Sequence, residues 1–234
     1  MKLVTVVILL LLVPIVRSTV AAFRPVFSDE TEADMEEGAT LEDRKVSECF
    51  GKLRAACSLN QRFSDAIDRY ARTLRVDKLR ETIERKVQAI CNEAEKDVTV
   101  PLLKKELSHS AAIVKQLVHN LPDFDRDRLN MWANLNDSNS ERNFFLEKIK
   151  SLPPADIECL TTSMNAVITR FVNGEPPKYI NELTRSITEE DKQQLSVRST
   201  TFEKAVDNLF EKLGMPTDDE DLRLFMSGIS KMSD

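Results

Sequence analysis

Apolar residues recur at every third or fourth position along most of the chain, the pattern of helices that bury one face. The first such face runs from Leu41 to Cys57. Asn60 is placed to cap a second helical segment, whose spacing continues to about residue 96. The pattern therefore predicts either one long helix over 60–96 or two helices with a break near 75–77.

Proline and glycine divide the rest of the chain into shorter helical segments. We expect Thr99 and Pro101 to open a helix that ends at Pro122, because proline is tolerated in a first helical turn. Further apolar faces lie over 129–132, 144–149, 157–171, 179–187, 195–213 and 222–229. No segment alternates convincingly as a strand does, so the sequence predicts an all-α, disulfide-tied bundle of eight or nine helices.

Composition supports this fold class. The 234 residues are 41% apolar, which suffices for a core, whereas 6% aromatic residues and five glycines are few for a β-sandwich or barrel. We expect residues 41–234 to form a single all-helical domain. A sub-boundary near 121–123 is the alternative organisation.

Residues 1–22 have the pattern of a secretory signal peptide. Lys2 precedes the apolar run Leu3–Val16, and the small residues Ser18, Ala21 and Ala22 offer cleavage sites. The run is shorter than the roughly 20 residues that span a bilayer, so an uncleaved anchor is the less favoured alternative. We therefore expect a secreted, extracellular protein without stable membrane insertion.

An acidic segment follows the signal. Residues 28–43 carry eight acidic side chains and no basic one, and like-charge blocks of this kind rarely fold. The sequence thus predicts a disordered acidic arm over 23–40, or a short propeptide. Without Lys2 and Arg17 of the signal, the chain outside residues 28–43 is balanced at 31 basic and 31 acidic residues. Net charge therefore indicates nothing about a partner of the folded domain.

The four cysteines are Cys49, Cys57, Cys91 and Cys159. Secretion and an even number favour two disulfides. Cys49 and Cys57 lie eight residues apart on a helix, about 12 Å along its axis, whereas a disulfide needs Cα atoms within about 7 Å. A chain break near 75–77 would return Cys91 to the level of Cys57, so we expect Cys57–Cys91 and Cys49–Cys159. One bridge with two buried free thiols is the alternative.

Two features are candidate surface sites. Asn136 begins the sequon Asn136-Asp137-Ser138 in a polar stretch, where N-glycosylation is physically accessible. The most basic stretch of the chain contains a candidate polyanion patch formed by Arg69, Arg72, Arg75 and Arg80. Acidic residues are interleaved with these arginines, so a salt-bridged, solvated helix face is the favoured interpretation.

No catalytic motif, metal-ligand spacing or cofactor fingerprint is present, so we expect a non-enzymatic protein without a cofactor and assign no catalytic or metal residues. His109 and His119 lie ten residues apart, too far for paired zinc ligands. We expect the protein to bind an extracellular partner, and not nucleic acid. The alternative is a carrier of a lipid or other hydrophobic ligand in a helical-bundle cavity, and an enzyme of unrecognised type is a third hypothesis.

Overall fold

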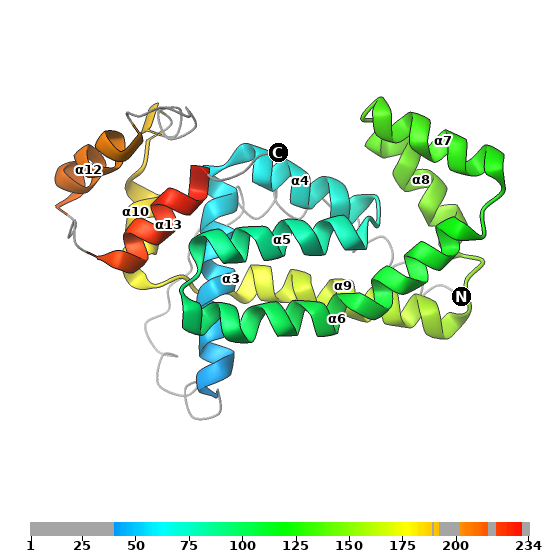
Figure 1. Cartoon of the computed structure of the whole chain (residues 1–234), viewed down its shortest axis with the longest axis horizontal. Coiled ribbons are helices and arrows are strands. Elements are labelled where there is room, and N and C mark those ends of the chain that lie inside the picture. Colours follow the sequence, from blue (N-terminus) through cyan, green and yellow to red (C-terminus); the bar gives the residue numbers. More distant parts are fainter. Residues whose placement is uncertain (1–39, 189, 192–201, 215–218, 231–234) are drawn as a thin grey trace, which may run out of the picture. The chain divides into compact units, whose positions relative to one another are not determined.

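The computed structural model describes residues 40–188, 190–191, 202–214 and 219–230. These residues contain ten helices with defined bounds and no strand, which confirms the all-α fold class (Figure 1). The expected signal peptide and all but the last residue of the acidic arm lie outside the described residues. The helices are α3 (Leu41–Leu59), α4 (Gln61–Arg72), α5 (Val76–Ile90), α6 (Glu93–His119), α7 (Asp123–Asn134), α8 (Ser138–Ile149), α9 (Pro154–Asn173), α10 (Lys178–Ser186), α12 (Phe202–Leu213) and α13 (Glu220–Ser230).

The first helices begin and end where the sequence places caps. Thr40 and Asp43 form a capping box at the start of α3. Asn60 caps α4 as expected, since its Oδ1 accepts a hydrogen bond from the Phe63 backbone at 3.0 Å. The helical segment is interrupted between α4 and α5, where Leu74 adopts a φ of 52°. The predicted break is therefore confirmed, and the single helix over 60–96 is wrong.

The next boundary differs from the expectation. Helix α5 ends at Ile90, and α6 runs without interruption from Glu93 to His119, with Pro101 inside it. The start of α6 is fixed by a reciprocal cap, in which Asn92 Oδ1 accepts from the Glu95 backbone at 3.0 Å and Glu95 Oε2 accepts from the Asn92 backbone at 2.9 Å. This cap, and not Pro101, begins the helix.

The chain divides into two compact units that are discontinuous in sequence. Among the described residues, unit 1 comprises 65–84 and 102–169, and unit 2 comprises 40–64, 85–101 and the described part of 170–230. Residues 102–169 all belong to unit 1, so neither unit begins or ends near 121–123. The assignment of 41–234 to a single domain stays a prediction.

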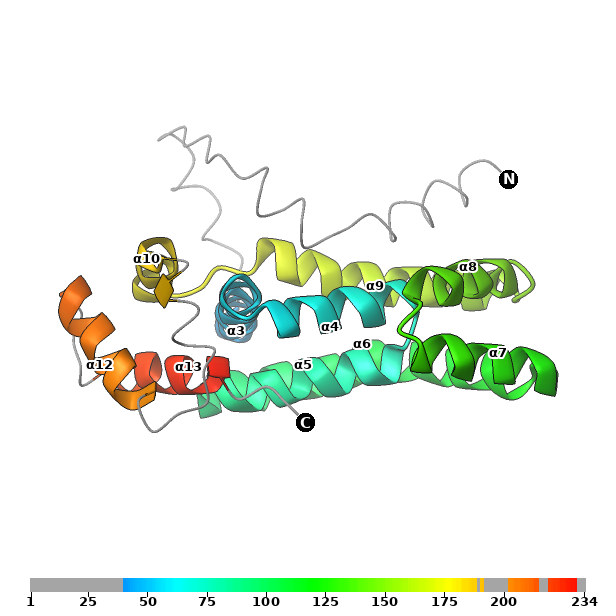
Figure 2. The same cartoon turned by 90° about the horizontal axis from the view of Figure 1, so that it is seen from above.

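Unit 2 is built on α3. Both α10 and α13 pack against this helix, as Figures 1 and 2 show. The chain that leaves α9 crosses α3 at Gly51 and Gly174, where a Cβ on Gly174 would lie 2.6 Å from the Gly51 nitrogen. Only glycine permits so close an approach of two backbones. The crossing is held by a hydrogen bond of 3.1 Å from the Glu175 backbone to the Ser47 carbonyl.

In unit 1, α7 and α8 pack against each other (Figure 1). Phe144 and Phe145 of α8 and Leu129 of α7 are buried there, and Phe144 lies in ring contact with Trp132. Across the described parts of the chain, no helix is both long enough and apolar enough to cross a bilayer.

Candidate functional site

The disulfide pairing corrects the expected one. Cys49 is bonded to Cys91, with an S–S distance of 2.06 Å and Cα atoms 5.6 Å apart. Cys57 and Cys159 are free thiols, each half-buried. The pairs Cys57–Cys91 and Cys49–Cys159 are therefore wrong, and one bridge with two thiols is what the structure contains. The reason is the position at which the end of α5 meets α3. This position lies about two helical turns closer to the N-terminus of α3 than expected, at Cys49 and not at Cys57.

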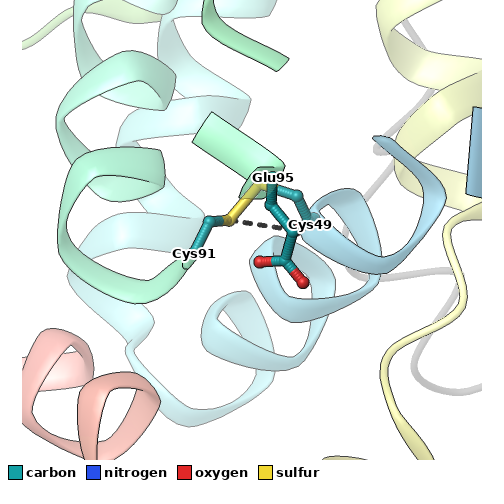
Figure 3. A group of neighbouring side chains, drawn as sticks. All are labelled: Cys49, Cys91 and Glu95. Carbon is teal, nitrogen blue, oxygen red and sulfur yellow. Dashed lines mark hydrogen bonds between the residues drawn. A yellow bond between two sulfur atoms is a disulfide. The ribbon is translucent and has the colours of Figure 1, made fainter. Parts of the chain in front are cut away.

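Glu95 lies directly beside this disulfide, as Figure 3 shows. The ligand atoms of Cys49, Cys91 and Glu95 all lie within 4.8 Å of one another, a grouping that could hold a metal ion if the cysteines were reduced. A metal requires cysteine thiolates, however, and here both sulfur atoms are consumed in the disulfide. The oxidised protein therefore has no thiolate at this position.

A buried cluster of charged groups surrounds Glu95. Lys52 of α3 is fully buried, and its ammonium group lies 2.9 Å from Glu95 of α6 and 2.8 Å from Asp221 of α13. Burial raises the pKa of the Glu95 carboxyl, and the Lys52 charge partly opposes this shift. Burial by itself would raise the pKa of the Asp221 carboxyl, but the hydrogen bond and charge of Lys52 hold this pKa below its ordinary value.

Asp221 collects further donors on the same oxygen. The Tyr179 hydroxyl of α10 donates to Asp221 Oδ2 at 2.9 Å, and Asn92 Nδ2 donates at 3.4 Å. Burial and the adjacent carboxylate raise the pKa of Tyr179, which keeps the hydroxyl protonated as a donor. The cluster thus ties α10, α13 and the start of α6 to α3. Its charged groups pair with one another, although Glu95 Oε1 has no hydrogen-bond partner besides its ion-pair contact with Lys52. We therefore assign the cluster to fold stability.

A second buried lysine holds the other end of α13. Lys86 is fully buried and donates to the carbonyl oxygens of Gly228 at 3.0 Å and Ile229 at 3.2 Å, in the last turn of α13. This position is favourable for a cation because the helix dipole is negative at its C-terminal end. Burial lowers the pKa of Lys86 to about 8, and burial raises the pKa of the nearby Cys57 thiol to about 12. The Cys57 thiol is therefore protonated and a poor nucleophile at neutral pH.

These polar residues were missed by the sequence prediction, although the chain carries signals for them. Lys52 stands three residues after Cys49, on the apolar face of its helix, and Lys86 stands beside Val87 in the apolar register of α5. A lysine in an apolar register indicates a buried cation that needs partners. The Asn92-x-x-Glu95 spacing is also the pattern of a capping box.

The four arginines of the candidate polyanion patch are all engaged within unit 1. Arg69 donates to Asn136 Oδ1 at 2.7 Å, and Arg75 pairs at 2.6 Å with Glu141, which is buried. The other two pair with acids of their own helices: Arg72 with Asp68 at 2.8 Å, and Arg80 with Asp77 and Glu84 at 3.7 Å. These contacts weaken the patch as a polyanion site and match the salt-bridged helix face. The polyanion assignment itself stays a prediction.

Asn136 lies in the turn between α7 and α8. It is exposed, with a φ of 55°, and its Oδ1 accepts the hydrogen bond from Arg69. Asp137 of the sequon caps α8 by accepting a hydrogen bond from the Ser140 backbone at 3.1 Å. Among the described residues, the Asn136 side-chain nitrogen, the atom to which a glycan is attached, donates no hydrogen bond.

An exposed apolar face on α7 is the most distinctive surface of unit 1. Phe124, Met131 and Leu135 are 70%, 47% and 69% exposed. Their spacing of seven and four residues places all three within about 40° of one another around the helix. Leu129, on the opposite side, is buried against the unit. The face therefore exposes large apolar groups beyond those that α7 needs for its own packing.

Arg128 lies within this face. Its guanidinium group sits 4.8 Å from the ring centre of Trp132 and 5.6 Å from that of Phe124. Asp125 lies 4.0 Å from Arg128, but it makes a shorter contact of 2.8 Å with Lys148. Aromatic residues, methionine and arginine are the residue types enriched in protein interfaces. We call Phe124, Arg128, Met131, Trp132 and Leu135 the α7 face.

His109 and His119 are both exposed on α6, and neither has a carboxylate partner among the described residues. No protein-family model matches the chain, and no curated protein or solved structure matches it.

Proposed function

We propose that the protein is secreted, is not an enzyme, and acts by binding a partner protein outside the cell through the α7 face. The observation that carries the proposal is the alignment of Phe124, Met131 and Leu135, each exposed, along one side of α7. Solvent exposure of such a stripe is unfavourable by about 25 cal/mol per Å² of apolar surface. A partner that covers the stripe would remove this cost.

Arg128 supports a protein partner over a purely apolar ligand. Its guanidinium is held over two aromatic rings and presents donors at the surface, so the face offers apolar area together with a fixed cation. An interface of this kind is suited to a partner with an apolar patch and an adjacent carboxylate. The proposed secretion rests on the pattern of residues 1–22.

Site-specific photocrosslinking tests the proposal. Benzoylphenylalanine is placed at position 131 of the α7 face or at position 178, where Lys178 is exposed in unit 2. Each protein is applied to intact cells, and adducts are identified by mass spectrometry. We expect one dominant cell-surface protein adduct from position 131 and none from position 178.

Competition gives the control. An excess of wild-type protein should abolish the adduct, whereas an excess of the Phe124→Ser/Leu135→Ser variant should not. Equal adducts from both positions, or no protein adduct at all, would contradict the proposal. If native mass spectrometry then showed a co-purified lipid, the alternative carrier function would replace it.

A further inference from the structure

The exposed side of α6 within unit 1 carries an unusual set of side chains. The exposed residues of this stretch include Lys104, Lys105, Ser108, His109, Ala112, Lys115, Gln116 and His119. At 100° per residue they occupy an arc of about 140°, and at 1.5 Å per residue they extend over about 22 Å. The arc contains three lysines, two histidines and no acidic residue. We call these eight residues the α6 face.

The cations of the α6 face are not neutralised. Among the described residues, Lys104, Lys105 and Lys115 take part in no ion pair, and neither His109 nor His119 has a hydrogen-bond partner. This separates the α6 face from the four arginines of the candidate polyanion patch, each of which has a partner. Unpaired cations in a row create a local positive potential that paired cations do not.

A neighbouring helix adds one more donor at the edge of the α6 face. Arg80 of α5 reaches Ser108, with Nη1 3.4 Å from the serine hydroxyl oxygen. The two acids closest to Arg80 in its own helix, Asp77 and Glu84, lie 3.7 Å from it. Both acids thus pair with Arg80.

The composition of the α6 face selects among anionic ligands. Insertion of a helix face into a membrane surface uses large apolar groups beside the cations, but Ala112 is the only apolar residue of the face. Single-stranded nucleic acid requires aromatic stacking platforms, and the face has none. A protein interface is depleted of lysine at its centre. A flexible, regularly charged polysaccharide needs only a row of ammonium and N–H donors along its length.

We propose that the α6 face binds a linear sulfated polysaccharide. Lys104, Lys105 and Lys115 contact sulfate oxygens, and His109 and Gln116 donate hydrogen bonds between them. This binding site is separate from the α7 face and does not depend on the proposed partner protein.

Heparin fragments provide the test, with affinity measured by biolayer interferometry at several salt concentrations. One variant replaces the three lysines of the face (Lys104→Gln, Lys105→Gln and Lys115→Gln). A control variant makes the same change in net charge at exposed lysines elsewhere (Lys78→Gln, Lys150→Gln and Lys178→Gln). Each lysine near an anionic surface contributes about fivefold in affinity, so the first variant should lose on the order of 100-fold. The control should stay within about threefold, and both should retain the wild-type melting temperature.

Non-sulfated hyaluronate and phosphatidylserine vesicles distinguish sulfate from other anions. We expect the logarithm of the heparin affinity to fall linearly with the logarithm of salt concentration. Hyaluronate and the vesicles should bind weakly at most. Equal losses in both triple variants would overturn the proposal, because net charge and not the α6 face would then determine affinity. Absence of heparin binding near physiological salt, or preferential binding to the vesicles, would also overturn it.

Discussion

Replacing Lys52 by methionine tests whether the buried polar cluster stabilises unit 2. Methionine preserves most of the volume of the side chain but removes its ammonium group. That group is fully buried and lies within 3 Å of both Glu95 and Asp221. Its loss leaves Glu95, itself almost fully buried, without a counter-charge. Asp221 is partly exposed and keeps its hydrogen bond from Tyr179, so Glu95 bears most of the effect.

The expected loss is large because removal of one partner from a buried ion pair costs about 3–5 kcal/mol in unfolding free energy. For a chain of this size each kcal/mol lowers the melting temperature by about 2–4 °C, so Lys52→Met should melt about 6–20 °C below wild type. The defect should also depend on pH. Without Lys52, the pKa of Glu95 rises further above its unfolded value, so the folded state holds the extra proton. The variant should therefore lose stability relative to wild type as pH rises from 5 to 7.5.

Thermal and urea unfolding, followed by circular dichroism, measure the effect. Lys78→Met is the matched control, because Lys78 is 57% exposed and its pair with Glu81 should contribute about 0.5 kcal/mol or less. The double variant Lys52→Met/Glu95→Gln should recover at least half of the loss, since it removes the unpaired carboxylate. A loss below about 1 kcal/mol for Lys52→Met, or a double variant no more stable than the single one, would show that the buried ion pair does not stabilise unit 2.

Three further predictions concern the cysteines, Lys86 and Asn136. Peptide mapping without reductant should find Cys49 linked to Cys91, and a Cys57–Cys91 peptide would contradict this. Reduction should lower the unfolding free energy by about 4 kcal/mol, because the bridge closes a loop with a separation of 42 residues. In a Cys57→Ser background, the unfolding free energy should rise by about 1 kcal/mol from pH 8 to 9. The pKa of Lys86 is about 8 in the folded protein and 10.5 in the unfolded chain, so the unfolded chain binds more protons in this pH range. Lys86→Met should flatten that rise, and an unchanged slope would count against the shifted pKa. Protein secreted by eukaryotic cells should carry a glycan that Asn136→Gln eliminates, measured as a change in intact mass; identical masses would show an unused sequon.

The helices could be predicted because their signals are local. The break after α4, the Asn60 cap and the burial of Leu129 each follow from residue types within a few positions. The boundary at 91–92 differs from the prediction because the Asn92–Glu95 capping box begins α6, whereas Pro101 lies inside the helix. Proline is tolerated in a first turn, but nothing in the sequence requires it to stand there.

The disulfide pairing could not be predicted because it depends on the level at which two helices meet. Cys49 and Cys57 lie about 12 Å apart along one helix, while neighbouring packed helices are about 8–10 Å apart. A helix that returns beside α4 is displaced along α3 by an amount that depends on how the helices pack, and here it meets α3 at Cys49. Sequence spacing gives the distance between two cysteines on one helix, but it does not give the position at which a second helix packs against the first.

The pairing of surface charges also could not be predicted from the sequence. The arginines Arg69, Arg72 and Arg75 stand out in the sequence, yet their partners include Asn136 and Glu141, more than 60 residues away. Lys104 and Lys115 are less conspicuous in the sequence and remain unpaired among the described residues. Which cations are neutralised is decided by tertiary contacts, and a count of basic residues does not contain that information.

Binding of labelled protein to intact cells measures the proposed interaction of the α7 face with an extracellular partner. Flow cytometry compares wild type with Phe124→Ser/Leu135→Ser and with a matched control, Leu41→Ser/Val172→Ser, which removes two other exposed apolar side chains. Removal of an aromatic interface anchor typically costs at least about 2 kcal/mol, so the α7 variant should bind at least about 30-fold more weakly. The control should bind as wild type does. Equal binding by all three proteins would contradict the proposed interaction.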